Sequence, residues 1–303
     1  MGMLRSELYR AFHRKGPYLT ILLGVLVIVG GYASTYFGQI VWWDKSVNEY
    51  NVWYIFLQTI GDNWSSPWGF ILPLLAVLPF GDTLIYDLNH GFEIPLILRV
   101  GARPYFFIKW VANFVVVIAV FSAVLCISLI IAVLWRHDFQ MPFVLSEERM
   151  KGSINLTPAA LAVDKLHHWN GVFASSYAPA VLQQLFWHHV GLFTAFTMAI
   201  SLMSATSISG IAVTAALWVK NRYLTLAVPF LLYLLFIVAP QYLLPGAFMW
   251  APHIMADAFW QFSRPVWTIV AYWLIPLIIT LACMSLGARR YGSLHLLRVD
   301  YRE

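Results

Sequence analysis

Side chains able to bind a partner or take part in chemistry are concentrated in one segment of this 303-residue chain, between Asp82 and Lys109. Acidic and basic residues are mixed there with glycine, proline and tyrosine. By spacing alone, the segment is either an ordinary solvated loop or a segment with a function of its own. Seven of its residues are candidates for a functional site: Asp87, Gly91, Glu93, Arg99, Arg103, Tyr105 and Lys109.

The same segment predicts a compact helical hairpin. Glycine commonly ends a helix, so a first short helix should end just before Gly91. A second short helix is expected over Glu93–Leu98, because Pro95 is acceptable in a first helical turn. Gly101 then breaks the chain, and Pro104 can start a long helix.

A second group of polar side chains recurs at helical spacing in an apolar segment. Such a stripe serves packing between helices, where hydroxyls bond across helices at roughly 0.6 kcal/mol each, or it lines a substrate path. The two roles coincide if this helix lies at a dimer interface. The hydroxyl stripe consists of Thr194, Thr197, Ser201 and Ser204.

Catalytic residues and a resident metal or cofactor are not expected in this chain. It contains neither a G-x-x-x-x-G-K-[ST] sequence for binding ATP nor an H-E-x-x-H sequence for zinc. Imidazoles do suit zinc and copper, so a membrane-embedded enzyme with its pocket in residues 136–189 is one alternative. Its histidines would come from His137, His167, His168, His188, His189 and His253.

The elements that position these residues follow from composition. Hydrophobic residues make up 60% of the chain and charged residues 11%, against about 45–50% and about 25% in soluble domains. A soluble fold cannot hide so much apolar surface, so we predict an all-α membrane protein with one transmembrane domain over residues 1–303. A helix needs about 20 apolar residues to cross the hydrocarbon. Six spans are expected: Tyr18–Ile40, Trp64–Gly81, Val111–Trp135, Val190–Trp218, Tyr223–Leu244 and Val266–Leu286.

Four segments are expected outside these spans. Residues 1–17 predict an amphipathic interfacial helix, ended by Gly16-Pro17, that is either a simple anchor or also packs against the spans. Residues 82–110 form a cytoplasmic loop and 136–185 an extracytoplasmic loop. Prolines and tryptophans interrupt 245–265, which suits a re-entrant hairpin in the outer leaflet before the last span. The basic residues of the interfacial helix, which can meet anionic headgroups, are Arg5, Arg10, Arg14 and Lys15.

The distribution of basic residues predicts the orientation. With six spans, the side that holds both termini carries 13 Lys and Arg residues and the other side 6. The positive-inside rule therefore places both termini in the cytoplasm. We interpret the net charge of +5 in this way, and not as a sign of nucleic-acid binding. A multi-pass protein of a bacterial plasma membrane is expected.

The order acidic–x3–Gly–x–Glu–x5–Arg–x3–Arg–x–Tyr–x3–Lys in the charged segment resembles that of the permease subunits of type-2 ABC exporters. The predicted order of interfacial helix, six spans, cytoplasmic loop after span two and re-entrant piece before span six is similar too. In that family the acidic residue four before the glycine is usually Glu, where this chain has Asp87.

The resemblance implies that the loop over 82–110 couples the spans to a separate cytoplasmic ABC ATPase, on which ATP and Mg would bind. Asp87 and Glu93, with Arg99 and Arg103, would supply polar docking contacts, and Tyr105–Phe107 would lock the loop to the bilayer interface. A second permease copy or homologue would complete a dimer. The chain itself would be no enzyme.

The six predicted spans contain no Asp, Glu, Lys, Arg or His. Proton-coupled carriers place such groups at membrane depth, so the absence favours an energy source outside the membrane. It also favours a hydrophobic or amphipathic cargo, such as a peptide or a drug-like molecule. Besides transport and the enzyme, a third hypothesis is a non-transporting anchor or sensor whose 82–110 loop recruits a cytoplasmic protein.

Overall fold

A computed structural model describes residues 2–35, 52–61, 68–135, 185, 189–219, 221–243 and 266–299. Every regular element in these ranges is an α-helix. The elements are α1 (Gly2–Phe12), α2 (Lys15–Thr35), α3 (Val52–Gly61), α4 (Trp68–Val77), α5 (Thr83–His90), α6 (Glu93–Val100), α7 (Ala102–Trp135), α11 (Val190–Ala215), α12 (Arg222–Leu243) and α14 (Val266–Val299).

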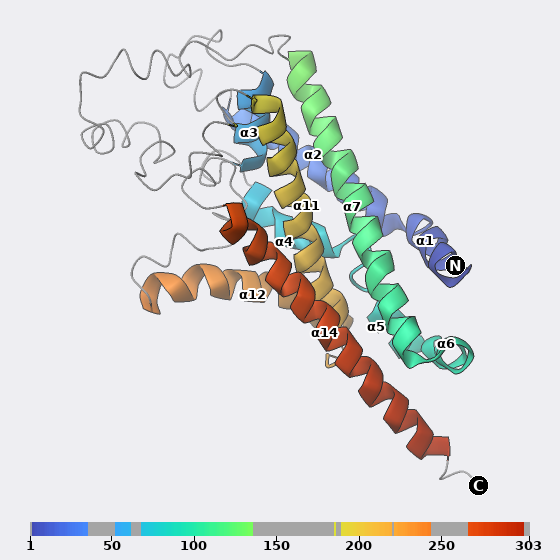
Figure 1. Cartoon of the computed structure of the whole chain (residues 1–303). Coiled ribbons are helices and arrows are strands. Elements are labelled where there is room, and N and C mark those ends of the chain that lie inside the picture. The colour runs from blue at the N-terminus through green and yellow to red at the C-terminus, as the bar shows by residue number, and fades with distance from the viewer. Residues whose placement is uncertain are drawn as a thin grey trace, which may run out of the picture.

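Four of these helices are long and apolar enough to cross a membrane: Lys15–Ser34, Ala102–Trp135, Val190–Ala215 and Val266–Arg289. They coincide with the first, third, fourth and sixth predicted spans, so the all-helical membrane class is confirmed. α7 and α14 have 34 residues each, which is about 51 Å of helix. The hydrocarbon core is only about 30 Å thick, so both helices are longer than a single crossing needs. The N-terminal end of α7 and the C-terminal end of α14 lie at the same end of the molecule as α6 (Figure 1).

The second and fifth predicted spans differ from this pattern. The second is represented by α4, which has only 10 residues and contains Pro73; the 10-residue α3 before it was not expected. α12 covers the fifth predicted span, but it runs across the bundle (Figure 1). Among the described residues, four helices are thus both long and apolar enough to cross a membrane, and the second and fifth crossings stay predictions. The re-entrant hairpin over 245–265 and the loop over 136–184 lie outside the described residues.

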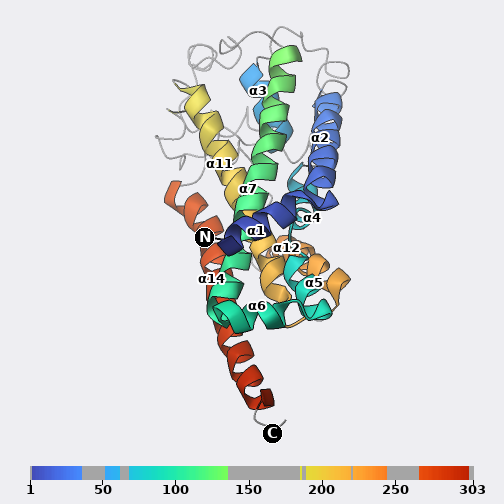
Figure 2. The same ribbon diagram turned by 90° about the vertical axis from the view of Figure 1, so that its right-hand side faces the viewer.

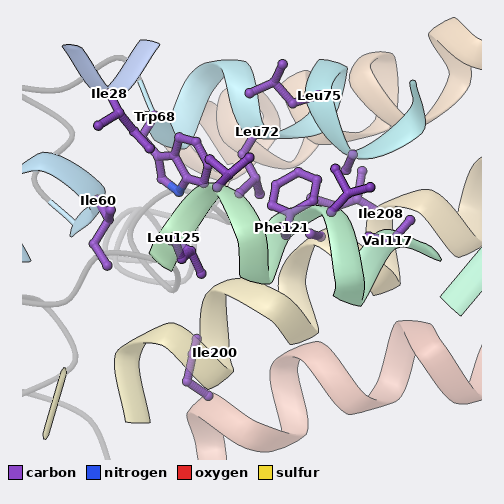
Figure 3. Close-up of a cluster of buried hydrophobic side chains, with 14 of the residues drawn as sticks. Ile28, Ile60, Trp68, Leu72, Leu75, Val117, Phe121, Leu125, Ile200 and Ile208 are labelled. Carbon is purple, nitrogen blue, oxygen red and sulfur yellow. The ribbon is translucent and has the colours of Figure 1, made fainter. Parts of the chain in front are cut away.

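The core is built around α11, which packs against α4, α7, α12 and α14. Side chains of α4, α7 and α11 interdigitate there (Figure 3). Trp68 of α4 meets Phe121 of α7 edge to face, with 5.9 Å between the ring centroids. Tyr32 of α2 donates a hydrogen bond of 2.9 Å to the carbonyl of Ser128 in α7. α4 is therefore fixed to α7 by an aromatic contact, and α2 by a hydrogen bond from a tyrosine.

α1 lies across α7, on which it packs (Figure 2). Ala11 is fully buried, and Leu4 and Leu8 pack against the core. Of the two expectations for this helix, the structure agrees with the one in which it packs against the spans. The expected break was misplaced, because α1 ends at Phe12 and residues 16–17 belong to the first turn of α2, where a proline costs no hydrogen bond.

The proline inside α4 has a compensating partner. Pro73 has no N–H, so the carbonyl of Gly69, four residues earlier, receives no helical hydrogen bond from it. The hydroxyl of Tyr233 in α12 donates to that carbonyl at 2.6 Å. This bond fixes α12 against α4 and satisfies a buried polar group in an apolar surrounding.

Replacing Tyr233 by Phe should lower the free energy of unfolding by about 1 kcal/mol, because the Gly69 carbonyl then stays buried without a partner. In a Pro73→Ala background the loss should fall to less than half, since the backbone N–H of the introduced alanine can bond the same carbonyl. Thermal unfolding of the purified protein in detergent measures both. Tyr223→Phe, at a position 82% exposed on the same helix, is the matched control and should change nothing. Equal losses in both backgrounds would contradict the compensation.

Candidate functional site

A cluster of charged and polar side chains joins α5 and α7 to α1, which is far from both in the sequence. α1 contributes Glu7 and Arg10, which are three residues apart and so share one helix face. α7 contributes Tyr105 and Lys109, which are four apart and share a face in the same way. α5 contributes Asp87. These five residues are called the charge cluster below.

Each cation of the charge cluster contacts both carboxylates. Lys109 Nζ lies 2.6 Å from Glu7 Oε2 and 2.6 Å from Asp87 Oδ2. Arg10 Nη2 lies 2.9 Å from Asp87 Oδ2 and 3.1 Å from Glu7 Oε2. The hydroxyl of Tyr105 donates to Asp87 Oδ2 at 3.0 Å. The two acids and two bases therefore form one closed network with no net charge.

Because this network is buried, its charged groups are stable only when each has a partner of opposite charge. The side chains of Asp87 and Lys109 are 0% exposed, and the Lys109 ammonium also lies 5.9 Å from the centre of the Phe80 ring. Each buried ion loses several kcal/mol of hydration, which only close partners of opposite charge offset. Removing one member leaves a net charge in the interior. The network is thus stable only when α1, α5 and α7 are all in place.

The charge states of Asp87 and Arg10 follow from their surroundings. Burial works to raise the pKa of the Asp87 carboxyl, but the charge of Lys109 and the hydrogen bond from Arg10 outweigh it, so this pKa lies below its usual range. Burial works to lower the pKa of Arg10, but the hydrogen bond to Asp87 and the charge of Glu7 outweigh that effect and raise it. Both groups are therefore charged at neutral pH.

The predicted helical hairpin is present as α5 and α6. Gly91 ends α5 with φ 69°, a conformation that glycine adopts without strain, and its N–H donates to the carbonyl of Asp87. α6 begins at Glu93 as expected, and Gly101, with φ 87°, separates it from α7. The local signals in the sequence placed both helices within a few residues.

The expected docking role of the acidic residues is corrected by their burial. Asp87 and Glu93 face the interior, so they cannot touch a partner directly, whereas Arg99 and Arg103 are exposed. Sequence reasoning also missed Glu7 as a site residue. The pairs at helical spacing in residues 7–10 and 105–109 were the only available signal, and they do not reveal their common partner.

The exposed surface of the hairpin is largely apolar. Leu98 is 78% exposed and Phe92 51%, and Ile94 is exposed beside them. The His90 ring stacks on Tyr86, with 4.2 Å between centroids, and on Phe92, with 6.0 Å. This stack stiffens the turn at Gly91. The three exposed apolar residues of the hairpin, Phe92, Ile94 and Leu98, are called the hairpin tip below.

A smaller set of ion pairs lies beside the charge cluster. Asp82, just before α5, pairs with Arg14 at 3.4 Å and with Arg222 of α12. The Arg222 side chain is half exposed, so water screens this set and each pair adds less than about 1 kcal/mol. Of the other predicted surface residues, Arg5 and Lys15 are exposed, whereas Arg10 is part of the charge cluster.

The hydroxyl stripe of α11 faces the interior of the chain. Thr194, Thr197, Ser201 and Ser204 are all buried. The threonines donate to carbonyls of their own helix, to Val190 and Phe193, and Ser204 donates to the carbonyl of Ser201. Further along, Ser209 donates to Asn113 Oδ1 of α7. Within the described chain, the stripe is therefore buried among the helices, and the hydrogen bonds of Thr194, Thr197 and Ser204 stay within α11.

The histidines proposed for the enzyme alternative are mostly outside the described residues. His189 is the exception, and it lies exposed just before α11. Among the described residues, no group of three His, Cys, Asp or Glu side chains is arranged to hold a metal ion.

Comparisons with protein-family models, with curated proteins and with solved structures found no match.

Asp87→Asn should lower the free energy of unfolding by about 3 kcal/mol, because it leaves an uncompensated positive charge in the interior. Lys109→Met alone should cost a similar amount. The double variant retains Glu7 and Arg10, which balance, so it should be more stable than the sum of the single losses predicts, by at least about 1 kcal/mol. Denaturant unfolding in detergent measures this double-mutant cycle.

Asp82→Asn is the control for this cycle, since its ion pairs are partly hydrated and its loss should stay below about 1 kcal/mol. If the losses of Asp87→Asn and Lys109→Met simply added, the two charges would act independently and the closed network would be refuted.

Proposed function

We propose that this chain is the membrane subunit of an ATP-driven exporter of the type-2 ABC kind. It would work as a dimer, with a second copy or a homologue, and each subunit would bind a cytoplasmic ATPase that carries the ATP and Mg. The termini and the α5–α6 hairpin would face the cytoplasm of a plasma membrane, and the cargo would be hydrophobic or amphipathic.

The charge cluster is the observation that carries this proposal. A subunit driven by an external ATPase needs a rigid lever that transfers displacement at the membrane surface to the spans. Asp87 fixes the hairpin to Lys109 of α7, and the same cations reach Glu7 of α1. Because the network tolerates no missing member, the hairpin, α1 and the start of α7 move as one body.

The hairpin tip supports a docking role. Its apolar side chains are exposed next to Arg99, and an exposed apolar patch with a polar rim is typical of protein-binding surfaces. The resemblance of the segment from Asp87 to Lys109 to the coupling loop of type-2 permeases points to the ATPase as the partner. The anchor hypothesis shares this docking surface but predicts no ATP-dependent flux.

The proposal includes six crossings of the membrane. α3 and α4 together would form the second crossing, and α12, with 22 residues, is long enough for the fifth. A re-entrant hairpin would precede α14. Since the hydroxyl stripe of α11 is buried inside the chain, the cargo path would lie between the two subunits.

Leu98→Asp should reduce both ATP-driven export and the amount of ATPase that stays bound during purification by roughly tenfold or more, because it puts a charge at the centre of an apolar contact. The folding of the variant should be unchanged, since Leu98 is exposed. Arg289→Asp is the matched control, at an exposed position of α14. Normal ATPase binding and export by Leu98→Asp would refute the docking surface.

The orientation has its own test. In Leu98→Cys, a membrane-impermeant maleimide should react only after the cells are permeabilised. The native Cys126 and Cys283 lie in the membrane-spanning parts of α7 and α14, so a variant without Leu98→Cys gives the background. Reaction in intact cells would place the hairpin outside and remove the basis of the transporter proposal.

A further inference from the structure

A positively charged cleft of about 530 Å³ opens where the α1–α2 junction meets α5 and α12. Its polar wall carries His13, Arg14 and Lys15 from the junction, Asp82 and Tyr86 from the hairpin, and Arg222 from α12. Cavities of roughly 300–1,000 Å³ are the usual size of small-molecule sites. The cleft is separate from the charge cluster, none of whose residues lines it.

The charges in the cleft do not balance. Asp82 is the only acid among the described residues that line it, and it already pairs with Arg14 and Arg222. With Lys15, the wall has three permanent cations against one carboxylate. α2 and α12 also begin here, and the N-terminal ends of helices carry partial positive charge. The excess of positive charge favours an anionic ligand, in contrast to the neutral charge cluster.

The lining of the cleft also has apolar residues, among them Leu19, Leu78 and Leu226. From Leu19 an apolar surface continues along the outside of α2. Leu19, Leu22 and Leu26 lie three and four residues apart on one face of α2, and all three are exposed. A ligand with an anionic head and a hydrocarbon tail can therefore place its head among the bases and its tail along this stripe.

Close packing gives the cleft a fixed floor. A Cβ atom at Gly16 would lie 2.6 Å from the carbonyl oxygen of Leu78, so only glycine lets the start of α2 approach the end of α4 this closely. Arg14 is held over the Tyr86 ring, with its Cζ 5.0 Å from the ring centre. Arg14 and Arg222, which both pair with Asp82, are thus positioned before any ligand arrives.

We propose that this cleft binds the phosphate headgroup of an anionic phospholipid from the surrounding leaflet. Arg14, Lys15 and Arg222 neutralise the phosphate, and an acyl chain lies against Leu19, Leu22 and Leu26. The head would contact Arg14 and Arg222, the two partners of Asp82, and so connect the α1–α2 junction with α12. This binding site requires a membrane-embedded chain but not the transport activity proposed above.

Purified full-length protein in a neutral detergent tests this with phosphatidylglycerol as the probe and zwitterionic phosphatidylcholine as the reference. Binding is measured by native mass spectrometry and by the rise in unfolding temperature. Phosphatidylglycerol should bind at least tenfold more tightly than phosphatidylcholine, and Lys15→Gln with Arg222→Gln should remove most of that preference, because each base near the headgroup contributes to it. Lys15→Gln alone, at an exposed position, should remove part of it.

Arg5→Gln is the matched control, since Arg5 is exposed on α1 outside the cleft. An equal loss in Arg5→Gln would show general surface attraction and overturn the site, as would equal affinity for the two lipids. Glycerol 3-phosphate and inorganic phosphate form the soluble arm and should bind far more weakly than the lipid. If they matched it, the apolar stripe would have no part in binding and the lipid assignment would be wrong.

Discussion

An ammonium group held between two carboxylates from different parts of the chain is the interaction on which the arrangement of the hairpin depends. Lys109 is separated from Glu7 by 102 residues, and its charge is balanced only when α1 and α5 both reach α7. Helices of eight residues, such as α5 and α6, are not stable by themselves. Their position is therefore determined by burial of Asp87 and Leu84 against the bundle.

The hairpin could be predicted from the sequence because its signals are local. Gly91 and Gly101 both adopt positive φ, and each ends a helix within a residue or two of the expected position. The burial of Asp87 could not be predicted in this way. It depends on Arg10 and Lys109, and helical spacing places each pair on a face without showing which faces meet. From the sequence, Asp87 therefore fitted either a solvated loop or a docking surface, and neither interpretation predicted its burial.

Contacts between residues far apart in the sequence also explain why the second and fifth predicted spans differ from the structure. Hydropathy reports how apolar a segment is, but the direction of α12 depends on what it packs against. Pro73 identified α4 as irregular, yet nothing near it in the sequence indicated that Tyr233 satisfies the carbonyl it leaves free. By contrast, the four helices that are both long and apolar enough to cross a membrane were found at the expected places. Composition was sufficient for these and for the all-helical class.

The hairpin is joined to α7 by the backbone, by apolar packing and by the ion pairs of the charge cluster. The backbone connection runs through Gly101, a single residue without a side chain, where torsion is cheap. A further connection runs through space from Asp87 to Lys109, and separating these two side chains would leave each buried ion without its partner. Displacement of the hairpin relative to α7 is therefore opposed by these ion pairs together with the apolar packing of Ile97 against Tyr105 and Phe106, and not by the peptide link alone.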